Sequence, residues 1–262
     1  MTTARALQLI DVLASEGQKS LSSDDVRTRL SLSPQAASNL LNRLTRDGLI
    51  EPIRRGHYLI RQLGELGVAA TSTDRLDEAV VVATDGRLHR ICFRTALHEH
   101  GLLTRPSRTI QVAVDRRLYV QTISGRPLEP IIEPTATIHV GTQHFGSARI
   151  STIERSLLEA AHRPRRVGGI ATVIEALHAA QPNNHALTSL GEQLQLPNGL
   201  RRLASLDRQL RLNKLDEVPH NLCHGRPIAL DPTDSRTDGP LDTTTGVRWP
   251  GPIEELAEII NQ

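Results

Sequence analysis

Apolar residues recur at helical spacing near the start of the chain. Within residues 4–14 they return every three or four positions, which predicts a first helix. In the stretch "LSSDDVRTRL", Ser22 and Asp25 have the spacing of a capping box, and Leu21 and Val26 are placed to form a hydrophobic staple around it. The pattern therefore predicts two helices in succession, of which the second is short.

A third helix is predicted after the three residues "SLS". Ser33 is suited to cap it, Pro34 occupies the first helical position, where its missing N–H costs nothing, and Gly48 ends it. Its apolar face consists of Ala37, Leu40, Leu41 and Leu44. Its opposite, polar face consists of Gln35, Ser38, Asn39, Asn42 and Arg46, with Arg43 on the flank. This order of helices around a three-residue turn predicts a helix-turn-helix.

The stretch "LIEPIRRGHYLI" predicts two short strands around an Arg55-Gly56 turn, which would form a wing. Asparagine and glutamine can bond to adenine in the major groove, arginine can bond to guanine, and basic residues on a wing are suited to phosphates or to the minor groove. The predicted DNA-binding residues are Ser33, Gln35, Ser38, Asn39, Asn42, Arg43, Arg46, Arg54, Arg55 and His57. The alternatives are a polar face that only meets solvent, or a winged domain that binds protein or RNA.

Periodicity weakens after the wing. We expect a DNA-binding domain over residues 1–62, a linker over 63–75 and a second domain over 76–262. The second domain begins with "AVVVAT", a short strand or helix, and "ICFRTALHEHGLL", a helix closed at Gly101. Alternation in "RTIQVAVDRR" predicts a strand, and two further short strands are expected in "PLEPIIEP" and "ATIHVGTQHF".

Helical patterns dominate the later part of the second domain. Ser151 and Glu154 have the spacing of a capping box before the apolar stripe of "ARISTIERSLLEAAHRP". Three more helices are expected in "GGIATVIEALHAAQP", "HALTSLGEQLQL" and "NGLRRLASLDRQLRLN". Residues 218–252 read as a long surface segment with one or two strands, and "IEELAEIINQ" as a terminal helix or strand. The fold class is therefore α+β, a winged helix-turn-helix followed by a mixed α/β domain.

Composition adds few constraints. The 262 residues carry a net charge of +2, and aromatic residues make up 2% of the chain, so stacking on bases is not expected to be the main mode of binding. Residues 1–61 hold nine basic and six acidic residues, a net charge of +3, which places the positive excess with the predicted DNA-binding domain. No apolar run is long enough to cross a membrane, so we expect a cytoplasmic protein without a membrane partner.

The sequence carries no recognised motif for catalysis or for cofactor binding. The sequence lacks a phosphate-binding glycine loop, a D-x-D pair and a G-x-S-x-G elbow, so we expect neither an enzyme nor a bound cofactor. The only lysines, Lys19 and Lys214, do not fit a strand-borne nuclease site. The metal candidates are His98 and His100 in "HEH" and His220, Cys223 and His224 in "HNLCH"; without a second ligand pair, we expect surface histidines and no metal. Cys92 is expected to be a small core residue.

The order of elements resembles a known family. A winged helix-turn-helix followed by "FRTALHEHGLL", "IQVAV", "ISTIERSLLEA" and "VGGIATVIEAL" is similar to the AbiEi antitoxins of abortive-infection operons. "LRRLASLDRQL" and "GPLDTTTGVRWP" are similar to the C-terminal part of longer members. The resemblance implies an autorepressor that binds inverted repeats in its own promoter and counters a nucleotidyltransferase-type toxin, directly or indirectly. Glu154 and Arg155 match the family's Glu-Arg pair, and the predicted cap gives Glu154 a structural role.

One alternative function remains open from the sequence, namely a ligand-responsive winged-helix regulator whose second domain holds a small-molecule pocket. A less favoured third class is a degenerate nuclease fused to a DNA-binding domain, which would need clustered acids in a cleft.

Overall fold

The N-terminal helices fold around their own core in the structure, a computed structural model. It describes residues 2–61, 75–118, 120, 122–123, 125–215, 226–236 and 239–258. The elements of this first part are α1 (Thr2–Ser15), β1 (Ser20–Ser22), α2 (Ser23–Leu30), α3 (Pro34–Arg46), β2 (Ile50–Arg54) and β3 (His57–Ile60). Leu13, Val26 and Leu41 are at most 1% exposed at its centre. The winged helix-turn-helix expected from the sequence is present.

Local capping explains where the first helices begin. The Ser22 side chain accepts a bond from the Asp25 amide at 3.1 Å, and the Asp25 carboxylate accepts one from the Ser22 amide at 2.8 Å, so the predicted capping box is confirmed. Ser33 caps α3 by accepting a bond from the Ala36 amide, with Pro34 at the first helical position. Strand β1, which pairs antiparallel with β3, was not predicted.

The second part of the chain is built on a six-stranded mixed sheet of order β6-β7-β5-β4-β9-β8. Its elements are α4 (Leu76–Thr84), β4 (His89–Ile91), α5 (Phe93–Glu99), β5 (Ile110–Val114), β6 (Thr122–Ile123), β7 (Arg126–Ile132), α6 (Thr135–Ile138), β8 (Thr142–Phe145), β9 (Ala148–Ser151) and α7 (Ile153–His162). In β5, Ile110, Val112 and Val114 pack with the cluster that contains α4, while Ala113 packs with α7. Because successive side chains of a strand point to opposite faces, α4 and α7 pack on opposite faces of the sheet.

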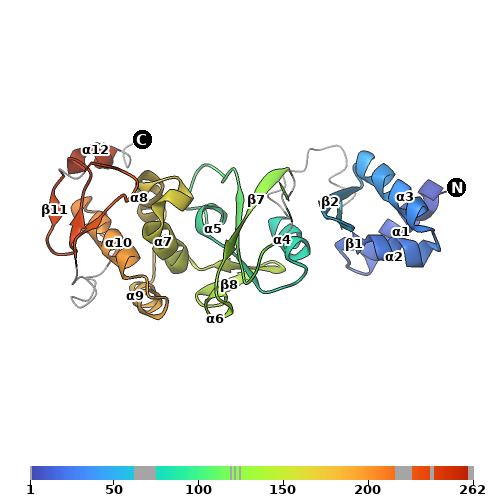
Figure 1. The fold of residues 1–262 in the computed structure, drawn as a ribbon, viewed down its shortest axis with the longest axis horizontal. Coiled ribbons are helices and arrows are strands. Elements are labelled where there is room, and N and C mark those ends of the chain that lie inside the picture. The colour runs from blue at the N-terminus through green and yellow to red at the C-terminus, as the bar shows by residue number, and fades with distance from the viewer. Residues whose placement is uncertain are drawn as a thin grey trace.

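Helix α4 also packs against the small winged sheet. Ile53 of β2 and Leu59 of β3 share an apolar cluster with Leu76, Ala79, Val80 and Ala83 of α4. Figure 1 shows α4 between the winged helix-turn-helix and the larger sheet. The stretch "AVVVAT" is therefore a helix buried between two sheets, which explains why it is apolar on all sides.

The C-terminal elements form a helical layer and a second small sheet. They are the 3₁₀ turn η2 (Pro164–Val167), α8 (Ile170–Ala179), α9 (Asn184–Gln193), α10 (Pro197–Gln209), β10 (Ile228–Ala229), β11 (Leu241–Asp242), β12 (Val247–Arg248) and α12 (Ile253–Ala257). Trp249 is 1% exposed, and its indole donates to Ser205 of α10 at 3.0 Å. The expectation of a surface segment is therefore wrong at Val247 and Trp249, which belong to the core.

Two predicted details of the central region are also wrong. The start of "ATIHVGTQHF" is the helical turn α6, and only Thr142–Phe145 form a strand. Thr152, instead of Ser151, caps α7 by accepting a bond from the Arg155 amide at 3.3 Å. The Glu154 carboxylate accepts a bond from the Asn183 amide, which lies directly before α9.

A buried group of charges connects the sheet to α7. Arg90 of β4 is fully buried and bonds to Glu133 and Glu159, while Arg155 of α7 bonds to the same two carboxylates at 2.9–3.0 Å. Arg90 also donates to Ser151, the residue that the sequence had indicated as a cap. Burial opposes ionisation of Glu159, but the guanidinium groups of Arg90 and Arg155 outweigh it and hold the pKa of Glu159 below its usual value.

We predict that Glu159→Gln lowers the free energy of unfolding by about 3–5 kcal/mol at pH 7, because two buried guanidinium groups lose a shared charged partner. The lowered pKa means that the folded state binds fewer protons than the unfolded state, so this stability is present above the usual pKa of 4.5 and is lost as the pH falls below it. Urea unfolding at pH 7 and pH 4 measures both effects.

The matched control is Glu16→Gln, since Glu16 pairs with Arg29 on the surface. We expect this variant to change stability by less than about 1 kcal/mol and to keep the wild-type acid response. An acid response in Glu159→Gln equal to that of the wild type would contradict the assignment.

Candidate nucleic-acid interface

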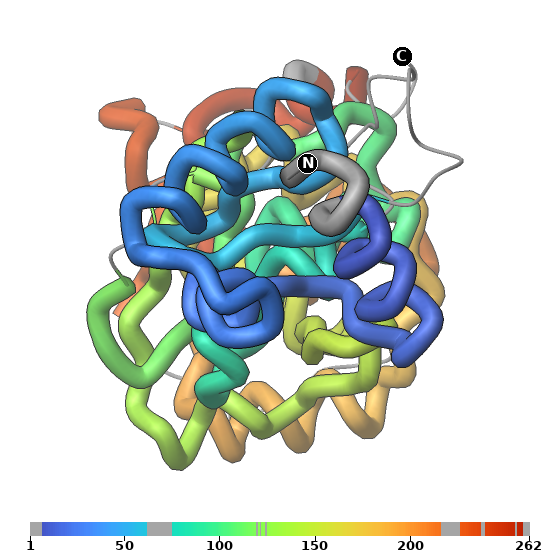
Figure 2. The backbone as a smooth tube through the Cα atoms, turned by 90° about the vertical axis from the view of Figure 1, so that its right-hand side faces the viewer, coloured from blue at the N-terminus to red at the C-terminus, as the bar shows by residue number. Residues whose placement is uncertain are grey.

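The polar face of α3 is turned to solvent. Gln35, Ser38, Asn39, Asn42, Arg43 and Arg46 are all exposed. On the opposite face, Leu40, Leu41 and Leu44 are at most 3% exposed, so packing fixes the rotation of the helix about its axis. Figures 1 and 2 show α3 at the N-terminal end of the molecule, on the side that faces away from the second part. Within the residues that the structure describes, the C-terminal half therefore does not cover this face.

The side chains of this face are partly ordered before any contact. The Gln35 amide donates to the Asn39 carbonyl oxygen at 3.2 Å, which leaves the Asn39 amide nitrogen free to donate to a base edge. Ser33 uses its oxygen as the cap of α3, and its hydroxyl can still donate. The helix has no acidic residue in its first turn, and Arg43 and Arg46 lie in its last turn. The whole face therefore offers hydrogen-bond donors to an acidic partner.

The wing is a tight hairpin with one arginine at its tip. Gly56 adopts φ +75°, a left-handed conformation that favours glycine, and its carbonyl accepts a bond from the Ser23 amide at 2.8 Å. The turn is thus tied to the start of α2. Arg55 is exposed at the tip, and it has no ion pair within the described part of the chain. Arg55 is therefore well placed to contact a phosphate.

The structure changes the roles expected for the other two wing residues. Arg54 forms an ion pair with Asp85, which follows α4, so its charge is already matched within the chain. Burial, and then the nearby Arg54 charge, lower the pKa of His57, so the imidazole is neutral at pH 7. Of the three wing residues predicted to meet phosphates or the minor groove, Arg55 is thus the one with an unmatched charge, and DNA contacts by Arg54 and His57 stay predictions.

The contacts that hold the wing to α4 were not found from the sequence. Glu78 of α4 is 7% exposed and forms ion pairs with Lys19, before β1, and with Arg75. Arg75 also donates to the carbonyl of Ile60 at the end of β3. The signal in the sequence is Glu78 directly before the apolar stretch "AVV". Its partner Lys19 lies far away in the sequence, so the pair could not be predicted.

The candidate metal ligands have structural partners where they are described. The ring nitrogens of His98 and His100 lie 3.1 Å from the Leu103 carbonyl and 2.6 Å from the Ser151 carbonyl, respectively. No group of three or more histidines, cysteines or acids within the described ranges is arranged to hold a metal. The "HNLCH" residues lie outside those ranges. Cys92 is fully buried, as expected, and burial raises the pKa of its thiol.

Comparisons with known proteins support the N-terminal assignment. Residues 1–57 match the MarR family. The chain shares its fold with a solved structure, the RV2827C protein from Mycobacterium tuberculosis, at a TM-score of 0.69 and 15% identity, over 98% of this chain and 94% of that one. No curated protein matches the sequence. None of the described helices is long and apolar enough to span a bilayer. The chain thus carries the winged helix-turn-helix of a DNA-binding transcriptional regulator.

We predict that Asn39→Ala and Asn42→Ala each cost about 1–3 kcal/mol in binding to the chain's own upstream promoter, because a base contact is lost. Binding to shuffled DNA should change little. Fluorescence anisotropy on both duplexes measures the two affinities, with Gln193→Ala on exposed α9 as the control. Equal losses on promoter and shuffled DNA would show that these side chains do not distinguish bases.

The wing offers a matched pair of arginines. Arg55→Ala should weaken binding to every sequence and reduce the slope of log K against log salt by about one, because one phosphate contact is lost. Arg54→Ala should leave that slope unchanged, since Asp85 already neutralises Arg54. Titrations at several salt concentrations provide the slopes. The same reduction in both variants would contradict the division of roles.

Proposed function

We propose that this chain is a cytoplasmic autorepressor that binds inverted repeats in its own promoter and an antitoxin that counters a nucleotidyltransferase-type toxin encoded beside it. The observation that carries the DNA-binding half is the exposed donor face of α3 next to Arg55. A regulator of this kind needs no catalytic residue of its own.

The antitoxin half is supported by the resemblance of "ISTIERSLLEA" and its neighbours to the AbiEi antitoxins. This segment forms the end of β9 and most of α7, where Ser151, Arg155 and Glu159 are at most 5% exposed. A motif so deeply buried supports the fold of the second domain. We infer that any contact with the toxin uses other, exposed residues of that domain.

We predict that co-expression of the full chain with the adjacent nucleotidyltransferase gene restores the growth of cells that the toxin alone arrests. The control is the triple variant Asn39→Ala, Asn42→Ala, Arg55→Ala under an unrelated promoter. If antitoxicity belongs to the second domain, the variant should rescue growth while it fails to repress a reporter. No rescue by the wild-type chain would refute the antitoxin role and leave the repressor role to be judged by the reporter.

A ligand-responsive regulator is the second candidate function. The observation that favours it is a cavity of about 270 Å³ in the second domain, lined by both apolar and charged side chains.

A further inference from the structure

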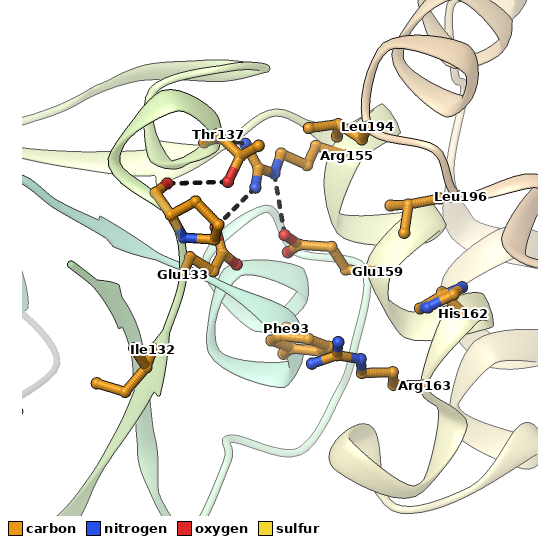
Figure 3. A pocket seen from close by; sticks show the side chains of 11 residues that line it. Phe93, Ile132, Glu133, Thr137, Arg155, Glu159, His162, Arg163, Leu194 and Leu196 are labelled. Atoms are coloured by element: carbon orange, nitrogen blue, oxygen red, sulfur yellow. Dashed lines mark hydrogen bonds and ion pairs between the residues drawn. The ribbon is translucent and has the colours of Figure 1, made fainter. Parts of the chain in front are cut away.

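The cavity lies where four parts of the second domain meet, one of which is the start of α5 with Phe93. Its walls come from the end of β7 and the start of α6, from α7, and from the turn between α9 and α10 (Figure 3). Phe93, Leu194 and Leu196 provide apolar surface. At about 270 Å³ the cavity is slightly smaller than the roughly 300–1,000 Å³ of drug-sized sites, so it suits a small molecule.

Phe93 is held in an uncommon backbone conformation at this wall. Its φ is +50°, in the left-handed region that a bulky residue rarely adopts. Buried Gln111 stabilises the conformation, because its side-chain oxygen accepts a bond from the Arg94 amide at 2.9 Å. Strained residues that their surroundings hold in place cluster at ligand sites. The backbone that carries the Phe93 ring is therefore fixed by its surroundings at the wall of the cavity.

The charges around the cavity do not cancel. Glu133 and Glu159 are each matched by the guanidinium groups of Arg90 and Arg155. Arg163 remains: it is exposed, and its side chain has no hydrogen bond or ion pair in the part of the chain that the structure describes. In Figure 3 it extends from the end of α7 toward Phe93. The cavity therefore has one unmatched positive charge beside an aromatic ring.

His162 adds no second charge to this site. Burial, and then the neighbouring Arg163 and Arg202 charges, lower the pKa of His162, so the imidazole is neutral at pH 7. Its Nδ1 is buried and has no hydrogen-bond partner among the described residues.

We propose that this cavity binds a small organic anion, whose oxyanion pairs with Arg163 and whose apolar body lies against Phe93, Leu194 and Leu196. The proposal deepens the second candidate function and does not depend on the antitoxin role. Its test contains neither DNA nor toxin, so its failure is distinguishable from failure of either proposed activity.

The test is calorimetric titration of the full chain with three probes of one shape: 2-naphthoate, the neutral 2-naphthamide and the cationic 2-naphthylmethylammonium. The naphthoate should bind about tenfold more tightly than the amide, as expected for one charge-assisted hydrogen bond at a partly exposed site. The ammonium should bind most weakly. Arg163→Gln should make the naphthoate and the amide equal, and Arg163→Glu should reverse the order of the two ions.

The matched control is Arg165→Gln, which removes an exposed arginine two residues away that does not line this cavity. It should keep the wild-type order of the three probes. The proposal is overturned if none of the probes binds, if naphthoate and amide bind the wild type equally, or if Arg165→Gln abolishes the preference as Arg163→Gln does.

Discussion

The arrangement of this molecule depends on the burial of α4 between two sheets. The outer apolar residues of the winged sheet must be buried, and Ile53 and Leu59 pack against α4. The helix buries its other side on the six-stranded sheet, so the two parts share one apolar cluster. Polar contacts secure both ends, because Glu78 binds Lys19 and Asp85 binds Arg54. The apolar contact supplies the stabilisation, and the ion pairs fix the relative orientation.

This constraint determines which N-terminal groups remain available for DNA. Covering the outer face of the winged sheet leaves α3 on the opposite side of its domain, with its donor face in solvent (Figure 1). It also places two adjacent arginines in different surroundings, because Arg54 forms an ion pair with Asp85 while Arg55 is exposed at the tip. Arg54 and Arg55 therefore contribute only one unmatched positive charge to the wing. We therefore expect sequence specificity to come chiefly from α3.

Features specified by local interactions could be predicted from the sequence, whereas features specified by distant residues could not. The caps at Ser22 and Ser33 and the faces of α3 follow from residues within one or two turns of each other, so these predictions were confirmed. The cap at Ser151 failed because that hydroxyl is taken by Arg90, which lies 61 positions away. Strand β1 has only three residues, too few to show alternation, and it exists because β3 offers an unpaired edge. The cavity is lined by residues from four separate segments, so no local pattern in the sequence indicates it.

Four arginines of the second domain are part of its core. Arg90, Arg155, Arg201 and Arg202 are at most 6% exposed. Each donates to backbone carbonyls of other segments, as Arg201 does to Thr245 and Gly246 near the C-terminal sheet. A planar guanidinium can connect several carbonyls at once, which a lysine ammonium does less well. These charges are therefore committed to the core. The positive charge that we expect to act on DNA is therefore the excess of residues 1–61, and not that of the buried arginines.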